Sequence, residues 1–222
     1  MKIVRVVDLS HSINAETQVY PGDPAPVLAV HSTIAKDGFN LLSVQMGSQT
    51  GTHVDAPFHF DDATEKIDQI PLERFMGRGI VLDVSGLAAR TPISWDMIRE
   101  QSAGFQPGDI ALIHTGWSKH FGTDEYFNHP YLTAEACQNL LDLGVLVFGI
   151  DAINIDETPD DTHEGVGFPV HHLIAERAGI ISENMTNLAA IDFADPLISL
   201  LPLKLEAADG APVRAVAIQV AN

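Results

Sequence analysis

Two histidines and an aspartate lie within seven positions of one another in the nine-residue stretch from Gly51 to His59, Gly-Thr-His-Val-Asp-Ala-Pro-Phe-His. His53 and Asp55 are two positions apart, so in an extended strand both side chains leave the same face and converge. Imidazole nitrogens and carboxylate oxygens bind zinc and similar divalent ions. Pro57 interrupts regular strand pairing, which lets His59 enter the same pocket from a loop. The stretch therefore predicts a metal site with a histidine general base beside it.

The alternative for a His-x-Asp sequence is a hydrogen-bonded pair on the protein surface, which is the common case for an isolated pair. Here a third group, His59, follows at a fixed offset. The preceding residues 48–52, Ser-Gln-Thr-Gly-Thr, are small or polar where a buried strand would prefer Val or Ile. These additions favour the metal site.

The stretch resembles the signature of the metal-dependent cyclase family, the family of bacterial kynurenine formamidases and isatin hydrolases, which is written His-x-Gly-Thr-His-x-Asp-x-Pro-x-His. Every position matches except the first, which is Gln49 in this chain. A second stretch, in which Glu183 follows His171 by twelve positions, resembles the family's other metal-binding segment. Three more segments match in the expected order: Tyr20-Pro21-Gly22-Asp23-Pro24, His114-Thr115-Gly116-Trp117 and Gly149-Ile150-Asp151.

The resemblance implies that His53, Asp55, His171 and Glu183 bind the metal and that His59 serves catalysis. Two nitrogens and two carboxylates suit zinc and would also accept manganese. The neighbouring His172 is a rival ligand, but the twelve-residue offset to Glu183 favours His171.

Gln49 is the departure from the family pattern. A histidine there would supply a neutral nitrogen, whereas a glutamine offers a carbonyl oxygen, a weaker ligand for zinc. We therefore expect one firmly bound ion per chain, with a second one weak or absent. The alternative is that Gln49 serves as a metal ligand itself.

The chemistry implied is hydrolysis, because a metal-activated water and a neutral imidazole base together attack a carbonyl. The leading substrates are small amides, in particular aryl formamides such as N-formylkynurenine. The alternatives are a cyclic amide such as isatin or a lactone, and, from another class, a non-catalytic metal-stabilised binding protein. Tyr20 and Phe58 are expected to stack against an aryl ring of the substrate. No phosphate-binding glycine loop is visible, so a nucleotide cofactor is unsupported.

Composition restricts the partners. The 222 residues include 12 Lys and Arg against 30 Asp and Glu, a formal charge of -18, which disfavours nucleic acid and anionic membranes. The local excess of acidic residues at 156–161 predicts a solvated loop. The single Cys137 and the absence of a signal-like start or long apolar run predict a cytoplasmic protein. The resemblance implies a homodimer or homotetramer binding a small-molecule substrate.

Without any linker-like segment, one domain over residues 1–222 is expected. Short runs rich in Val and Ile predict strands over 3–7, 27–30, 80–84, 110–113, 145–150 and 213–220. Helices are expected over 95–101 after Ser94, over 134–143 between Thr133 and Gly144, and from Pro169 to about Arg177. The pattern indicates an α/β (α+β) protein with a mixed β-sheet core and few helices lying to one side. The resemblance implies the swivelling β/β/α fold.

Overall fold

A nine-stranded mixed sheet organises the chain. The computed structural model describes residues 2–221, so Met1 and Asn222, the two ends of the expected domain, lie outside the described residues. The strands are β1 (Lys2–Asp8), β4 (His53–Asp55), β5 (Met76–Asp83), β7 (Ile110–His114), β9 (Val147–Ile150), β10 (Ile180–Glu183), β11 (Leu197–Ser199), β12 (Gly210–Pro212) and β13 (Val216–Ala221). Their order is β1-β13-β11-β5-β7-β9-β10-β4-β12. The run from β5 to β10 is parallel, and the other pairs are antiparallel.

The helices that pack on this sheet lie along one face of it, as predicted. In β7, Ala111 and Ile113 pack in one core with residues of the helices, whereas Ile110 and Leu112 pack in a second core on the other face. Residues of β1 and β13 join residues of β4 and β12 in the second core, so the two ends of the sheet curl toward each other. The α-helices are α1 (Ile34–Asp37), α2 (Trp95–Ile98), α3 (Ala134–Asp142) and α4 (Pro169–Glu176).

Local sequence explains where the helices begin and end. Thr133 caps α3, because its Oγ1 accepts a hydrogen bond from Ala136 N at 3.2 Å. Gly144 follows α3 with φ of +89°, a conformation that glycine adopts without strain. Pro169 suits the first turn of α4, where its missing N–H has no partner to lose. The predicted helix over 95–101 was too long, since α2 ends at Ile98 and a 3-10 turn follows.

The six predicted strands are present as β1, β2 (Val27–Ser32), β5, β7, β9 and β13, with shifted ends. The sequence did not predict β3 (Leu41–Gln45), β11, β12, or the short pair β6 (Pro92–Ile93) and β8 (Tyr131–Leu132). Three-residue strands carry little periodicity, and the Gly-Ala-Pro of β12 has the composition of a turn. The 3-10 helices are η1 (Pro57–His59), η2 (Leu72–Phe75), η3 (Gln101–Gly104), η4 (Trp117–His120), η5 (Asp124–Asn128) and η6 (Leu188–Ala190).

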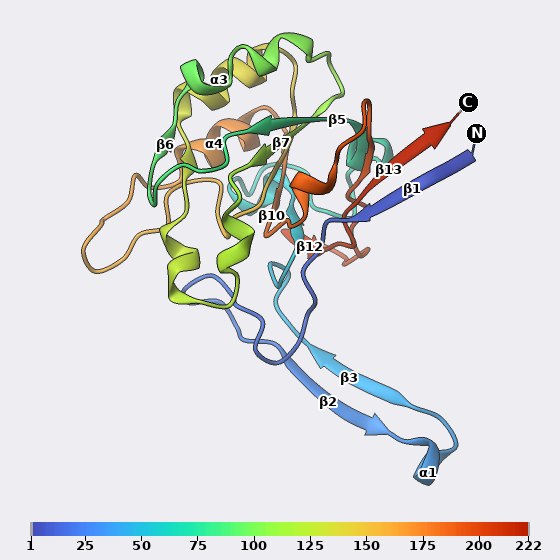
Figure 1. Ribbon diagram of the computed structural model, residues 1–222. Coiled ribbons are helices and arrows are strands. Elements are labelled where there is room, and N and C mark those ends of the chain that lie inside the picture. The colour runs from blue at the N-terminus through green and yellow to red at the C-terminus, as the bar shows by residue number, and fades with distance from the viewer. Residues whose placement is uncertain (1, 222) are drawn as a thin grey trace.

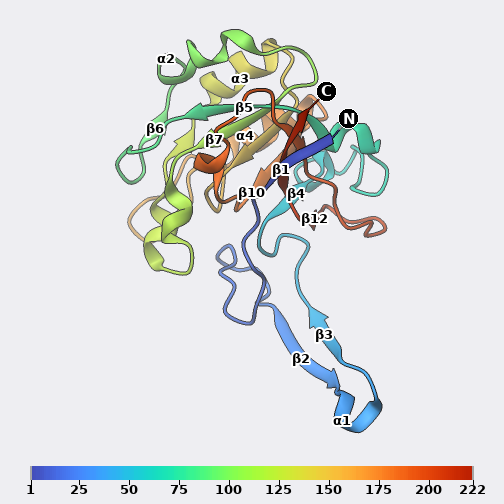
Figure 2. The ribbon, with the colours of Figure 1, turned by 45° about the vertical axis from the view of Figure 1, so that its right-hand side comes forward.

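An arm formed by residues 27–45 projects from the body of the molecule. It is the hairpin of β2 and β3, with α1 at its tip (Figures 1 and 2). Seven of its large apolar residues are between 48% and 71% exposed: Val27, Val30, Ile34, Phe39, Leu41, Leu42 and Val44. An apolar surface of this kind usually marks an interaction site.

Among the described residues, no helix combines the length and apolarity that crossing a membrane requires.

Candidate active site

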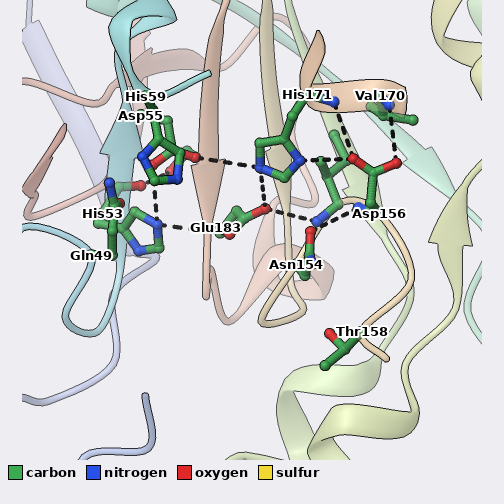
Figure 3. Close-up of polar contacts among 12 residues, drawn as sticks. Gln49, His53, Asp55, His59, Asn154, Asp156, Thr158, Val170, His171 and Glu183 are labelled. Atoms are coloured by element: carbon green, nitrogen blue, oxygen red, sulfur yellow. Dashed lines mark hydrogen bonds and ion pairs between the residues drawn. The ribbon is translucent and has the colours of Figure 1, made fainter. Parts of the chain in front are cut away.

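Strand register brings three of the predicted ligands together. His53 and Asp55 stand on one face of β4, and β10 runs antiparallel beside it. Glu183 is the register partner of His53, so its side chain lies on the same face of the strand pair. His171 comes from the first turn of α4, and Figure 3 shows its ring directed at the carboxylates of Asp55 and Glu183.

The two imidazoles stand on opposite sides of the two carboxylates (Figure 3). His53 Nε2 lies 3.4 Å from Asp55 Oδ1 and 3.7 Å from Glu183 Oε2. His171 Nε2 lies 3.8 Å from Asp55 Oδ2 and 3.4 Å from Glu183 Oε1. Each carboxylate therefore presents one oxygen to each imidazole.

The donor set fits a divalent cation. The four residues are only 3% to 6% exposed, and neither oxygen of Asp55 accepts a hydrogen bond from any described residue. A buried carboxylate without such partners is costly unless a cation or proton compensates its charge. Donor atoms of His53, Asp55 and Glu183 all lie within 4.8 Å of one another. A metal ion held there would satisfy the oxygens that the protein leaves without partners.

Hydrogen bonds at the far nitrogen of each ring orient both imidazoles. His53 Nδ1 donates to Gly51 O at 2.8 Å, and His171 Nδ1 donates to Asp156 Oδ2 at 2.7 Å. Because a carbonyl oxygen can only accept, His53 carries its proton on Nδ1 and presents the Nε2 lone pair to the site. Such outer contacts fix the tautomer of a metal-binding histidine.

Asp156 is a site residue that the sequence reasoning missed. The acidic run at 156–161 was predicted as a solvated loop, which is wrong for its first half, since Asp156 is fully buried. Its carboxylate also accepts from the backbone of Val170 at 3.0 Å and of His171 at 3.1 Å. It therefore satisfies N–H groups at the start of α4 while it orients the His171 ring. No motif marked this residue, because its partners lie fourteen and fifteen positions away.

The site has a strong affinity for positive charge. Burial lowers the pKa of His53, but Asp55 and Glu183 outweigh it and raise the pKa to about 9. Burial likewise lowers the pKa of His171, and hydrogen bonds with Asp156 and Glu183 raise it to about 10. Protons and a divalent cation would compete for the same negative potential.

His59 lies at the edge of the same pocket, on η1, as the predicted turn at Pro57 requires. Its Nδ1 is 3.0 Å from Asp209 Oδ2, an interaction that leaves Nε2 as the free ring nitrogen. Burial lowers the pKa of His59, and the hydrogen bond with Asp209 raises it, with a net increase. Asp209 is a second residue that the sequence reasoning missed.

Asp209 also fixes Gln49. Gln49 Nε2 donates to Asp209 Oδ2 at 2.8 Å, and Ser48 Oγ donates to Asp209 Oδ1 at 2.8 Å. The amide nitrogen of Gln49 is thereby directed at Asp209, while its Oε1 is buried and has no hydrogen-bond partner among residues 2–221. Gln49 thus offers a free oxygen to the pocket that it lines.

A cavity of about 250 Å³ opens beside these groups. It brings together Tyr20, Asp23, Gln49, His53, His59, Phe60, Ile153, Asn154, Phe168, His171, Glu183 and Asn184. Tyr20 is at the cavity, as expected. Phe58 is not: it packs beside the second core, with Lys66 Nζ 4.7 Å from its ring centroid. Phe60 and Phe168 supply the aromatic wall instead.

The geometry of α4 decides which of the two neighbouring histidines, His171 or His172, faces the site. His171 is 4% exposed and faces the carboxylates, whereas His172 is exposed and meets the edge of the Phe60 ring. Successive residues of a helix point about 100° apart, so only one of them can face the site.

Comparison with known proteins agrees with this geometry. The model of the Cyclase family matches residues 7–157. A kynurenine formamidase of Bacillus cytotoxicus is 31% identical over 97% of this chain and 98% of its own length. Isatin hydrolase A from Ralstonia solanacearum has the same fold, with a TM-score of 0.88 at 24% identity, covering 97% of this chain and 92% of that one. A structure described as a potential metal-dependent hydrolase with cyclase activity covers 98% of this chain and 99% of its own, with a TM-score of 0.79 at 25% identity.

The buried donor set and these relatives place the chain among metal-dependent hydrolases. It belongs to the cyclase family. The predicted fold class is confirmed by the isatin hydrolase likeness.

Proposed function

We propose that this protein hydrolyses small aryl formamides, with N-formylkynurenine as the leading substrate. The observation that carries the proposal is that His59, held by Asp209, lines the same cavity as His53, His171 and Glu183. The relative named kynurenine formamidase supports the choice of substrate. We place catalysis on His59 and metal binding on His53, Asp55, His171 and Glu183.

The reaction needs a nucleophile, a base and a proton for the leaving group. A bound divalent ion supplies Lewis acidity, which lowers the pKa of water and polarises the formyl carbonyl. His59 Nε2 takes the proton from the attacking water as the new C–O bond forms at the formyl carbon. The same imidazolium then returns that proton to the nitrogen as the C–N bond breaks, which releases the aryl amine and formic acid, and the acid loses its remaining proton to solvent as formate. Asp209 keeps the His59 ring in the tautomer with its proton on Nδ1, so that Nε2 is free to take up and return the proton.

The remaining residues would orient the substrate. Tyr20, Phe60 and Phe168 form an aromatic wall on which an aryl ring can stack, and Ile153 adds an aliphatic contact. Gln49 Oε1 is an acceptor for a substrate N–H or a ligand for the metal. The second candidate reaction is the opening of a cyclic amide or lactone, which the same base and water would perform. A purely metal-stabilised binding protein would have no use for His59 and Asp209.

We propose zinc or manganese as the metal, with one firmly bound ion per chain. The paired oxygens of Asp55 and Glu183 reach toward both imidazoles, so a second ion would share the carboxylates. Figure 3 places Gln49 on the His53 side of the site. An amide oxygen there binds zinc less strongly than a histidine nitrogen would, which supports the expectation of one firm ion.

We propose further that the chain works as a single-domain homodimer or homotetramer in the cytoplasm. The exposed apolar side chains of the arm support assembly, because a second copy could cover them. Cys137 is buried and is a free thiol, which is compatible with a reducing compartment.

The test is formate release from N-formylkynurenine by zinc-loaded and manganese-loaded protein. His59→Asn should retain the ion, measured by elemental analysis, and lose roughly two to four orders of magnitude in kcat. His53→Ala should lose the ion itself. Hydrolysis at full rate by chelated protein, or a metal-free His59→Asn variant, would refute the assignment.

A further inference from the structure

We propose that the side-chain amide of Asn184 donates a hydrogen bond from Nδ2 to the oxygen of the carbonyl group that is attacked, and that it stabilises the negative charge developing on that oxygen. The inference rests on the proposed amide hydrolysis and adds a catalytic residue to it.

An uncommon backbone conformation brings Asn184 into the cavity. Successive side chains of a strand point to opposite faces, so a residue that continued β10 after Glu183 would face away from the predicted metal ligands. The strand ends at Glu183, and Asn184 has a φ of +54°, in the left-handed region that is uncommon for residues other than glycine. Glu183 and Asn184 consequently line the same cavity. Residues held in this conformation concentrate at active sites.

Three hydrogen bonds hold Asn184 in place. Its backbone N donates to Ala152 O at 2.7 Å, and its backbone O accepts from Thr52 Oγ1 at 2.6 Å. Its side-chain Oδ1 accepts from Tyr126 Oη at 3.0 Å. Burial raises the pKa of Tyr126 well above its ordinary value, so the hydroxyl keeps the proton that it donates. Both the backbone and the amide plane of Asn184 are therefore fixed before a ligand binds.

The amide nitrogen of Asn184 is available to a ligand. The two ends of a planar amide diverge, so an Oδ1 held by Tyr126 directs Nδ2 away from that ring. Asn184 as a residue is only 3% exposed, yet Nδ2 is not sealed from solvent as the unpartnered Gln49 Oε1 is. Its opening is the cavity that Asn184 lines. Nδ2 is thus a fixed donor that faces the space where a substrate would lie.

A donor at this place complements the other polar groups of the site. The carboxylate of Glu183 and the neutral Nε2 of His59 are acceptors, and Gln49 uses its amide nitrogen on Asp209. A formamide carbonyl oxygen can only accept, so it needs a donor or a cation. Asn184 follows Glu183 directly, so its amide stands close to the place where a carbonyl attacked beside the ligands must lie. A preorganised neutral donor there stabilises the developing oxyanion.

Asn184→Gly removes the donor without straining the backbone, because glycine adopts a positive φ readily. In metal-loaded protein acting on an aryl formamide, kcat should fall by about 10-fold to 100-fold. This is less than the loss of about 10²–10³ for a donor that acts without a metal, because a bound cation would share the charge. KM should change little, since the hydrogen bond strengthens only as charge develops on the oxygen.

Asn187→Gly is the matched control. Asn187 also has a positive φ, +57°, but it is exposed, lies outside the cavity lining and donates from Nδ2 to Asp8 O at 2.9 Å. The same substitution in the same backbone conformation should leave kcat and KM at their wild-type values.

Tyr126→Phe tests whether the orientation of the amide matters, because it keeps the buried ring and removes the hydroxyl that holds Asn184 Oδ1. Alone, it should lower kcat by about 2-fold to 10-fold, the scale of one hydrogen bond between neutral groups. Added to Asn184→Gly, it should lower kcat no further, because Tyr126 then has no amide to position. An equal further loss in the double variant would overturn the positioning of the amide by Tyr126.

Binding measurements separate this inference from the proposed function. Calorimetry on metal-loaded protein gives the Kd of two ligands with the same ring: the aryl amine product, and its methylphosphonamidate, in which a tetrahedral phosphorus and its oxygens replace the formyl group. Asn184→Gly should weaken the methylphosphonamidate by about 10-fold to 100-fold and leave the amine unchanged. If that result is found although no formamide is hydrolysed, the proposed reaction fails and the donor stands. Wild-type kcat in Asn184→Gly, or an equal weakening of both ligands, would overturn the donor.

Discussion

Replacing Asp209 by asparagine removes one charge and tests how His59, the proposed catalytic base, is held. In the protein, Asp209 accepts hydrogen bonds from three donors: His59 Nδ1 at 3.0 Å, Gln49 Nε2 at 2.8 Å and Ser48 Oγ at 2.8 Å. An asparagine has only one acceptor oxygen, so its NH₂ group must face one of these donors. If it faces His59, the imidazole accepts at Nδ1 and carries its proton on Nε2, and it can no longer take a proton from water.

The expected magnitude follows from the geometry. A hydrogen bond to a charged group contributes about 1.5–3 kcal/mol when buried, but the side chains of His59 and Asp209 are 31% and 33% exposed. After discounting for solvent screening, we expect Asp209→Asn to lower the free energy of unfolding by only about 1–2 kcal/mol. Loss of the base should lower kcat by roughly two to four orders of magnitude. Catalysis should therefore suffer far more than stability.

The assay is the pH dependence of kcat/KM on metal-loaded protein. His59 acts when neutral, so activity rises with pH through the pKa of His59. Asp209 raises that pKa, and its replacement should move the acidic limb of the profile to lower pH. Ser48→Ala is the control, because it removes the bond to Oδ1 and leaves Oδ2 with His59. Wild-type kcat with an unmoved acidic limb in Asp209→Asn would refute the positioning role.

Two further predictions concern the metal. Chelation should lower the melting temperature. The metal-free protein should also lose stability from pH 7 to pH 10, because folding raises the pKa of His53 to about 9 and that of His171 to about 10. The stability that these protonated histidines contribute is complete below about pH 6.5 and disappears as the pH rises through the two raised pKa values. A flat profile from calorimetric scans would contradict it. Gln49→His should raise the metal content after gel filtration from about one ion per chain toward two, because imidazole is the stronger zinc ligand. Two firmly held ions in wild type would show that Gln49 does not set the number.

The sequence predicted the groups whose relation is local. His53 and Asp55 are two apart on a strand, and that periodicity alone places both side chains on one face. Another local signal, the interruption of strand pairing at Pro57, predicted that His59 would enter the pocket from a turn. Phe58 does not line the cavity, because the 3-10 turn at Pro57 directs it toward the second core. Phe60, two positions on, lines the cavity in its place.

Groups that depend on distant pairing were not predictable in this way. Asp209 precedes β12, and it approaches His59 only because β12 pairs with β4, which lies more than 150 positions earlier in the chain. Neither Asp209 nor Asp156 belongs to a recognisable motif, and both are carboxylates in a chain rich in carboxylates. What distinguishes them is a hydrogen bond to the ring of a histidine distant in the sequence, and that contact is a property of the fold.

The arm and the cavity share the same chain segments, so the assembly proposed above would also affect the cavity. Tyr20 and Asp23 precede β2, and Gln49 follows β3, so both ends of the arm carry residues of the cavity. An isolated two-stranded hairpin is marginally stable in water, and this one exposes its apolar side chains. Whatever covers the arm also restrains the chain segments on which Tyr20 and Gln49 stand. Gln49 has a second restraint, its hydrogen bond to Asp209, whereas Asp23 has only the turn that its backbone N closes with Tyr20 O. If the proposed assembly covers the arm, its loss should therefore disturb Tyr20 and Asp23 sooner than His53, Asp55 and Glu183, which lie on strands of the nine-stranded sheet.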